Sequence, residues 1–139
     1  MILLDTSGLL AALAGDQRRH RESAAALLAS EGPFVLSPFV LAELDYLLNK
    51  LAGIDAALRL LDEIAAGAYL LAPFASEDVA RAREVVSKHR AAAIGLADAS
   101  IVVLSEHYDC LDLLSLDERH FRALRGAGGK RFRLLPADG

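Results

Sequence analysis

The chain has no tryptophan, a single cysteine and only 6% aromatic residues, and these scarcities exclude several classes of protein. Cys110 cannot form a disulfide within the chain, and it lies in an apolar stretch, so we expect a small buried residue in a reducing compartment. No apolar run reaches the ~18 residues of a membrane span, and Asp5 interrupts the first apolar run too early for a signal peptide. We therefore expect a cytoplasmic protein with no membrane association.

Aliphatic residues supply most of the hydrophobic content, which is 54% of the 139 residues. A core of Leu, Ala, Val and Ile is typical of proteins in which helices cover a sheet. A chain of this length fits one domain that spans residues 1–139, and folding buries roughly two-thirds of its surface. Leucine-rich helices often retain apolar surface, so we also expect a homodimer.

Positive charge is scarce overall, since the formal net charge is −4. This argues against a protein that holds nucleic acid by bulk positive charge, but it leaves local phosphate contacts open. Basic residues gather in three clusters: Arg18, Arg19 and Arg21; Lys88 and Arg90; and Arg119, Arg122, Arg125, Lys130, Arg131 and Arg133. Such clusters are usually solvated faces, and only a nearby catalytic centre favours a role in binding.

Short apolar runs bounded by turn or cap residues predict strands near 1–5, 33–37, 69–72, 111–116 and 131–135. Helical periodicity predicts helices near 7–14, 17–30, 38–51, 54–67, 76–89, 97–107 and 118–124. Continuous apolar strands that alternate with helices predict an α/β fold, with a parallel sheet covered on both faces. Ligands bind such sheets at the carboxyl ends of the strands, where Asp5 and Asp117 lie.

Four acids stand in apolar surroundings that predict burial: Asp5, Glu43, Asp98 and Asp117. Burying four carboxylates without a cation costs too much free energy, so the set indicates a divalent metal site. Each acid also has a simpler interpretation. Asp5, Asp98 and Asp117 could each cap the helix that follows, and for any one of them alone this explanation is at least as good.

Glu43 gives the sharpest signal of the four acids. Ser37 and Pro38 read as the N-cap and first residue of a helix. Glu43 then shares one helical stripe with the apolar residues at positions 40, 44, 47, 48 and 51. A buried salt bridge is the alternative, but the segment 33–48 contains no basic residue. We therefore favour a metal ligand at this position.

Motifs of several other enzyme classes are absent. The four histidines show no ligand spacing such as HxxxH, which argues against zinc. No GxGxxG, GxxxxGK[ST] or GxSxG motif supports dinucleotide binding, P-loop chemistry or a nucleophile elbow. Carboxylate ligands alone select hard cations such as Mg²⁺ or Mn²⁺, which suit hydrolysis of phosphodiester bonds. Arginines beside such a centre would contact flanking phosphates, and Arg119 and Arg122 follow Asp117 closely in sequence.

Four segments carry these features in order along nearly the whole chain: Met1–Ser7, Leu36–Leu44, Ile94–Ala99 and Leu114–Phe121. Together they resemble the PIN-domain ribonucleases and, within them, the VapC toxins of prokaryotic toxin-antitoxin pairs. The resemblance implies a three-layer α/β sandwich around a parallel sheet of about five strands. It also implies endonucleolytic cleavage of RNA with Mg²⁺ or Mn²⁺. Asp5, Glu43 and Asp98 match the metal-binding acids of the family, and Asp117 matches the fourth, which contacts the metal directly or through water.

The resemblance further implies partners and supporting residues. VapC proteins are generally homodimers that a VapB-type antitoxin inhibits, and their substrates are structured RNAs of translation, notably tRNA anticodon loops and the sarcin-ricin loop of large-subunit rRNA. We expect hydrogen bonds that orient the acids from Thr6, Ser7 and Ser115. We expect RNA contacts at the rim of the site from Arg18, Arg19, Arg119 and Arg122.

Three other functions remain open at this point. The first is a catalytically silent PIN-like module that binds RNA or protein, although all four acids are present. The second is a phospho-acceptor domain with Asp5 as nucleophile, but the DxD start of such phosphatases is missing because position 7 is serine. The third is a metal-dependent nuclease that acts on DNA, which composition alone does not separate from a ribonuclease.

Overall fold

Five short parallel strands form the centre of the protein, which we describe from a computed structural model of residues 1–139. The strands are β1 (Ile2–Leu4), β2 (Phe34–Leu36), β3 (Leu70–Leu71), β4 (Asp112–Leu114) and β5 (Arg133–Leu135). Their order in the sheet is β3-β2-β1-β4-β5. Leu3 in the central strand is in register with Val35 on one side and with Leu113 on the other. All five predicted strands are present, and they are shorter than predicted.

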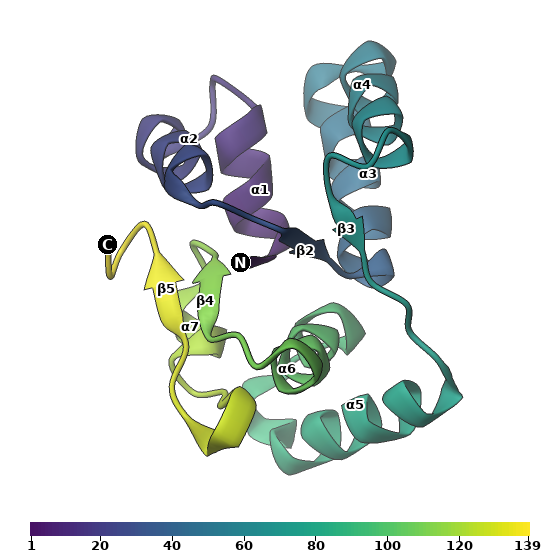
Figure 1. Cartoon of the computed structure of the whole chain (residues 1–139), viewed down its shortest axis with the longest axis vertical. Helices are drawn as coiled ribbons and strands as arrows, with labels where there is room; N and C mark the ends of the chain where they lie inside the picture. The colour runs from purple at the N-terminus through teal and green to yellow at the C-terminus, as the bar shows by residue number, and fades with distance from the viewer.

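Seven α-helices cover the sheet: α1 (Thr6–Leu13), α2 (His20–Ala29), α3 (Pro38–Ala52), α4 (Ile54–Ala65), α5 (Ser76–Lys88), α6 (Leu96–Tyr108) and α7 (Glu118–Phe121). Two short 3₁₀ helices, η1 (Arg90–Ala92) and η2 (Ala127–Gly129), complete the chain. Figure 1 shows α5 and α6 on the opposite side of the strands from α1 and α2. The predicted three-layer α/β sandwich with a central parallel sheet is therefore confirmed.

The core is aliphatic, as the composition predicts. Thirty buried hydrophobic residues form one cluster that includes every residue of β1 and the middle of α6. Cys110 belongs to this cluster and is buried, as expected for a small apolar residue. None of the helices combines the length and the apolar character that crossing a membrane requires.

Helix α3 starts where the sequence predicts, but it places Glu43 differently. Ser37 is the N-cap, its hydroxyl accepts a hydrogen bond from the Phe39 amide over 3.1 Å, and Pro38 follows as the first helical residue. The predicted burial of Glu43 is wrong, because this residue is exposed. The buried face of α3 runs through Val40 and its successors at steps of four. Glu43, three residues after Val40, lies about 60° from that residue around the helix axis, at the edge of the stripe.

The carboxyl ends of β1 and β4 meet at one edge of the sheet. The amide of Asp5, just after β1, donates a hydrogen bond to the Leu114 carbonyl at the end of β4 over 3.0 Å. Helix α1 then passes so close to β4 that a Cβ atom added to Gly8 would overlap the Leu114 carbonyl and lie 2.8 Å from the Ser115 nitrogen. The glycine in the Asp-Thr-Ser-Gly segment therefore permits the close approach that joins the two strand ends.

Candidate metal centre

Asp5 lies at the centre of the polar cluster at this edge of the sheet. Its residue is only 5% exposed, and it occupies the N-cap position of α1 without capping the helix through its side chain. Instead, Oδ2 of Asp5 accepts hydrogen bonds from the hydroxyls of Ser7 and Ser115, each over 2.7 Å. Burial raises the pKa of Asp5, the two serines and the Thr6 amide lower it, and the net shift is upward. The capping interpretation of this acid therefore does not hold.

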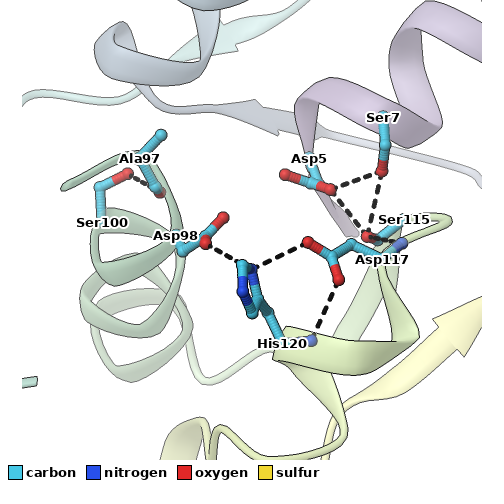
Figure 2. A network of polar contacts seen from close by, with 8 residues as sticks. All are labelled: Asp5, Ser7, Ala97, Asp98, Ser100, Ser115, Asp117 and His120. Carbon is cyan, nitrogen blue, oxygen red and sulfur yellow. Dashed lines mark hydrogen bonds and ion pairs between the residues drawn. The ribbon is translucent and has the colours of Figure 1, made fainter. Parts of the chain in front are cut away.

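The two serines connect Asp5 to the loop after β4. The Ser7 hydroxyl accepts a hydrogen bond from the Leu116 amide, and the Ser115 hydroxyl accepts one from the Asp117 amide, each over 3.0 Å. Each hydroxyl has one proton, and both protons are directed at Oδ2 of Asp5. Figure 2 shows the other carboxylate oxygen of Asp5 pointing away from the serines, on the side where Asp98 lies. One oxygen is thus fixed by the protein, while the other faces the site.

Asp98, Asp117 and His120 form the second part of the cluster. Nδ1 of His120 lies 3.0 Å from Oδ2 of Asp98 and 3.0 Å from Oδ2 of Asp117, although neither contact has the alignment of a hydrogen bond. Oδ1 of Asp117 accepts a hydrogen bond from the His120 amide over 3.0 Å, so Asp117 also caps α7. Figure 2 shows the imidazole between the two carboxylates, which approach it from α6 and from the loop before α7.

Asp98 carries the clearest electrostatic signature of the site. Burial raises the pKa of Asp98 to about 6, and the negative charges of Asp5, Asp117 and Glu43 act in the same direction, whereas His120 opposes them. Glu43 makes the smallest of these contributions to the pKa of Asp98, and its residue is exposed. A buried carboxylic acid with several acidic neighbours is the environment in which a bound cation relieves repulsion.

Serines also hold the first turn of α6, where Asp98 lies. The Ser100 hydroxyl donates to the Ala97 carbonyl over 2.6 Å and lies 2.7 Å from the Ser37 hydroxyl. Because the Ser100 proton is used on the carbonyl, Ser37 is the donor between the two serines. Both serines are fully buried. This chain of hydrogen bonds fixes the start of α6 against the start of α3.

The sequence matches the model of the PIN domain family over residues 2–127. The chain belongs to the PIN-domain family. A curated relative, Ribonuclease VapC26 from Mycobacterium tuberculosis, is 41% identical over 135 residues, which cover 97% of this chain and 100% of the relative. The match places this PIN domain among the VapC proteins.

Two solved structures share the fold at lower identity. VapC20 from Mycobacterium tuberculosis, described as a sarcin-ricin loop cleaving toxin, is 20% identical, with a TM-score of 0.78 over 84% of this chain and 90% of that chain. A toxin-antitoxin complex from Klebsiella pneumoniae contains a chain that is 19% identical, with a TM-score of 0.68 over 91% of this chain and 95% of that chain. At these identities, the likeness establishes the fold of the PIN domain.

The PIN fold brings together most of the acids singled out in the sequence. Asp5, Asp98 and Asp117 converge, as Figure 2 shows, whereas Glu43 is an exposed residue of α3 whose charge acts on Asp98. The hydroxyl of Thr6 is buried but has no hydrogen-bond partner, so only its backbone amide acts on Asp5. Among the residues expected to orient the acids, the serines at positions 7 and 115 make such contacts and Thr6 does not.

The four arginines predicted to lie at the rim of the site differ in how they are paired. Arg19 forms an ion pair with Glu22 over 3.1 Å. Arg122 is held by Glu118 over 2.8 Å and by both carboxylate oxygens of Asp138 over 2.7 Å. The other two, Arg18 and Arg119, are exposed and have no carboxylate within ion-pair distance. These two guanidinium groups are therefore free to contact phosphate.

His120 is the member of the PIN-domain site that sequence reasoning missed. His120 has no second histidine or cysteine at the spacing of a zinc site, so the sequence gives no sign of a histidine ligand by that pattern. Its position three residues after Asp117, on the same side of a helical turn, was the available signal. With Asp98 and Asp117 it offers three donor atoms that all lie within 4.8 Å of one another.

Proposed function

We propose that this PIN-domain protein is the endoribonuclease toxin of a type II toxin-antitoxin pair, and that it hydrolyses phosphodiester bonds in a structured RNA of translation. The RNA is a tRNA or the sarcin-ricin loop of large-subunit rRNA, the target named for the structural neighbour VapC20. The observation that carries the proposal is the convergence of Asp5, Asp98 and Asp117 at the carboxyl edge of the sheet of a VapC relative.

The residues of this site fit a divalent cation. Buried carboxylates with raised pKa values are poorly satisfied by the protein alone, because their only nearby basic side chain is His120. Asp5, Asp98 and Asp117 would hold Mg²⁺ or Mn²⁺, with Glu43 completing the set and His120 available as a nitrogen donor. When bound, the cation lowers the pKa of a bound water and offsets negative charge on the scissile phosphate.

Each protein group has a separate task in this proposal. Ser7 and Ser115 hold one oxygen of Asp5, so the other oxygen stays directed into the site. The His120 amide fixes one oxygen of Asp117 in the same manner. Such hydrogen bonds orient ligands before substrate arrives, which avoids reorganisation during the reaction. The pKa of Asp98, which burial and the neighbouring acids raise to about 6, still leaves its carboxylate mostly ionised above that pH.

RNA must approach an acidic site, so local positive charge is needed. Arg18 and Arg119 supply it in this proposal, because both are exposed and lack an acidic partner. Contacts from these arginines to flanking phosphates would position the strand without reading its sequence. Arg19 and Arg122 are already held in ion pairs, so they contribute less to phosphate contacts in this proposal.

A VapB-type antitoxin and a second copy of the chain are the proposed protein partners, and the cytoplasm is the proposed location. Helix α4 has an unpartnered apolar face made of Ile54, Leu58 and Leu61, all at least 40% exposed. Tyr46 and Leu51 of α3 are also exposed hydrophobic residues. A surface of this kind fits protein contacts in a VapC family whose structural neighbour is a toxin-antitoxin complex.

The experiment that tests the proposed function is cleavage of total RNA from translating cells, with the new ends mapped. Wild-type protein and Asp5→Asn are compared in Mg²⁺, in Mn²⁺ and in EDTA. Asp62→Asn, which changes an exposed carboxylate on α4, is the matched control. We expect discrete cuts that need a metal, persist in the control and disappear with Asp5→Asn. Binding of RNA without cuts under any metal would favour a silent interaction module, and cuts confined to DNA would favour a DNA nuclease.

A further inference from the structure

A pocket of about 440 Å³ opens directly beside the acidic site. It lies between α1, the loop from α1 to α2, and the loop after β4, and it shares Ser7 and Asp117 with the acidic site. Its remaining walls include Leu10, Leu116, Gln17 and Arg18, and we call it the Gln17 pocket. Its volume lies in the range of sites that enclose small molecules.

The walls of the Gln17 pocket combine apolar surface with unused polar groups. Leu10 and Leu116 can cover the faces of a planar ring. The side-chain amide of Gln17 makes no hydrogen bond within the protein, so its two donors and its acceptor are free. Arg18 has no ion pair, in contrast to its neighbour Arg19. The pocket therefore offers the Gln17 amide, which can pair with the donors and acceptors of a base edge, and the Arg18 guanidinium, which can bind a phosphate.

The loop that carries these groups is fixed before any ligand binds. The backbone amide of Gln17 donates a hydrogen bond to the Ala14 carbonyl over 3.1 Å. The backbone carbonyl of Gln17 accepts a hydrogen bond from the His20 amide over 3.2 Å. The His20 ring donates to the Ala11 carbonyl over 2.7 Å, which ties the start of α2 to α1. A preformed loop loses little conformational entropy on binding, so modest contacts from Gln17 and Arg18 suffice for recognition.

We propose that the Gln17 pocket binds the base of the nucleotide next to the scissile phosphate, and that Gln17 selects this base while Arg18 contacts the adjoining phosphate. The inference rests on the proposed function, since Ser7 and Asp117 join the pocket to the acidic site. An amide that pairs with both a donor and an acceptor of one base discriminates against bases with another pattern. Gln17 is thus a specificity residue of the ribonuclease.

The first test maps cut sites in total RNA from translating cells for wild type, Gln17→Ala, Arg18→Ala and the control Arg83→Ala, which removes an exposed arginine on α5. We expect Gln17→Ala to retain metal-dependent cleavage but to lower the preference for one base beside the cut by about tenfold or more. Arg18→Ala should weaken RNA binding and reduce its salt dependence while leaving the base preference unchanged. Arg83→Ala should resemble wild type. Unchanged sequences around the cuts of Gln17→Ala would overturn the inference.

The second test does not depend on cleavage. The four nucleoside monophosphates are titrated separately into wild-type protein with Mg²⁺, and the side-chain amide signal of Gln17 is followed by NMR. We expect one nucleotide to shift this signal most, and backbone signals of Leu10 and Leu116 to shift with it; in Gln17→Ala the difference among the nucleotides should disappear. If none of the four shifts signals from the pocket, the inference fails, even where wild-type protein still cuts RNA. Absence of metal-dependent cuts would instead refute the proposed ribonuclease site.

Discussion

Replacing Asp98 with asparagine should change how the stability of the metal-free protein depends on pH. Asp98 has a raised pKa of about 6 because it is buried beside other acids, against an ordinary value of 3.8. The folded protein therefore binds this proton more tightly than the unfolded chain does. The stabilisation from protonated Asp98 is complete below pH 3.8 and is lost as the pH rises through about 6.

The size of the stability loss follows from the pKa shift of Asp98. Raising the pKa from 3.8 to about 6 corresponds to about 3 kcal/mol of unfolding free energy, lost between acidic and neutral pH. The Asp98 side chain is only 18% exposed, so solvent screening reduces the figure little. A bound divalent cation would stabilise the ionised form and add about 2.7 kcal/mol at a concentration of 100 times its Kd.

Urea unfolding between about pH 4 and pH 7.5 measures this effect. In EDTA, wild-type protein should lose stability across this range, and Asp98→Asn should show a flatter profile because its amide does not ionise. Saturating Mn²⁺ should restore the stability of wild type near pH 7 and should act much less on Asp98→Asn. The exposed control Asp62→Asn should follow wild type in both conditions. Parallel pH profiles for wild type and Asp98→Asn, or equal unfolding free energies with and without Mn²⁺, would refute the reasoning.

Three further substitutions test the packing and the hydrogen bonds around the site. Gly8→Ala should lower the free energy of unfolding by about 1–3 kcal/mol in urea, because the added Cβ would overlap the Leu114 carbonyl. Ser115→Ala removes a hydrogen bond to Asp5 and should weaken Mn²⁺ binding by about 10- to 100-fold in calorimetry. His120→Ala removes the nitrogen donor and should weaken binding of Mn²⁺ more than binding of Mg²⁺, which keeps to oxygen ligands.

Matched variants make the tests of Gly8 and Ser115 specific. Gly15→Ala adds a Cβ atom with no atom within 4 Å, so it should leave the stability nearly unchanged. Ser87→Ala changes a serine on α5 that makes no hydrogen bond through its side chain, so Mn²⁺ binding should be unaffected. A Gly8→Ala protein as stable as wild type would show that α1 can move away from β4. Equal losses of Mg²⁺ and Mn²⁺ affinity in His120→Ala would show that the imidazole only positions the acids.

The sheet and the convergence of Asp5, Asp98 and Asp117 were predictable because local patterns determine them. The continuous apolar runs around Leu3, Val35 and Leu113 permit only strands buried on both faces. Ser37 and Pro38 mark the start of α3 by chemistry that acts within one helical turn. Parallel strands place their carboxyl ends at one edge, so residues after different strands converge there whatever lies between them in sequence.

The features that sequence reasoning missed depend on contacts between distant segments. The edge position of Glu43 follows from the rotation of α3 about its own axis as it packs on the sheet. A stripe of apolar residues fixes this rotation only to within a fraction of a turn. The contact between His120 and Asp98 joins two elements, and no local pattern encodes it. In the same way, Arg122 pairs with Asp138, sixteen residues further along the chain, and the local sequence does not show this ion pair.

The central claim is that the acids at the carboxyl edge of the sheet form one divalent metal centre. Anomalous diffraction from crystals grown with Mn²⁺ tests it most directly, because it locates the ion without assuming any activity. We predict an anomalous peak in coordination contact with the carboxylates of Asp5, Asp98 and Asp117, which should be lost in Asp5→Asn crystals. Two results would contradict a metal centre at these acids. One is the absence of an anomalous peak among the three side chains at saturating Mn²⁺, and the other is a peak that Asp5→Asn leaves unchanged.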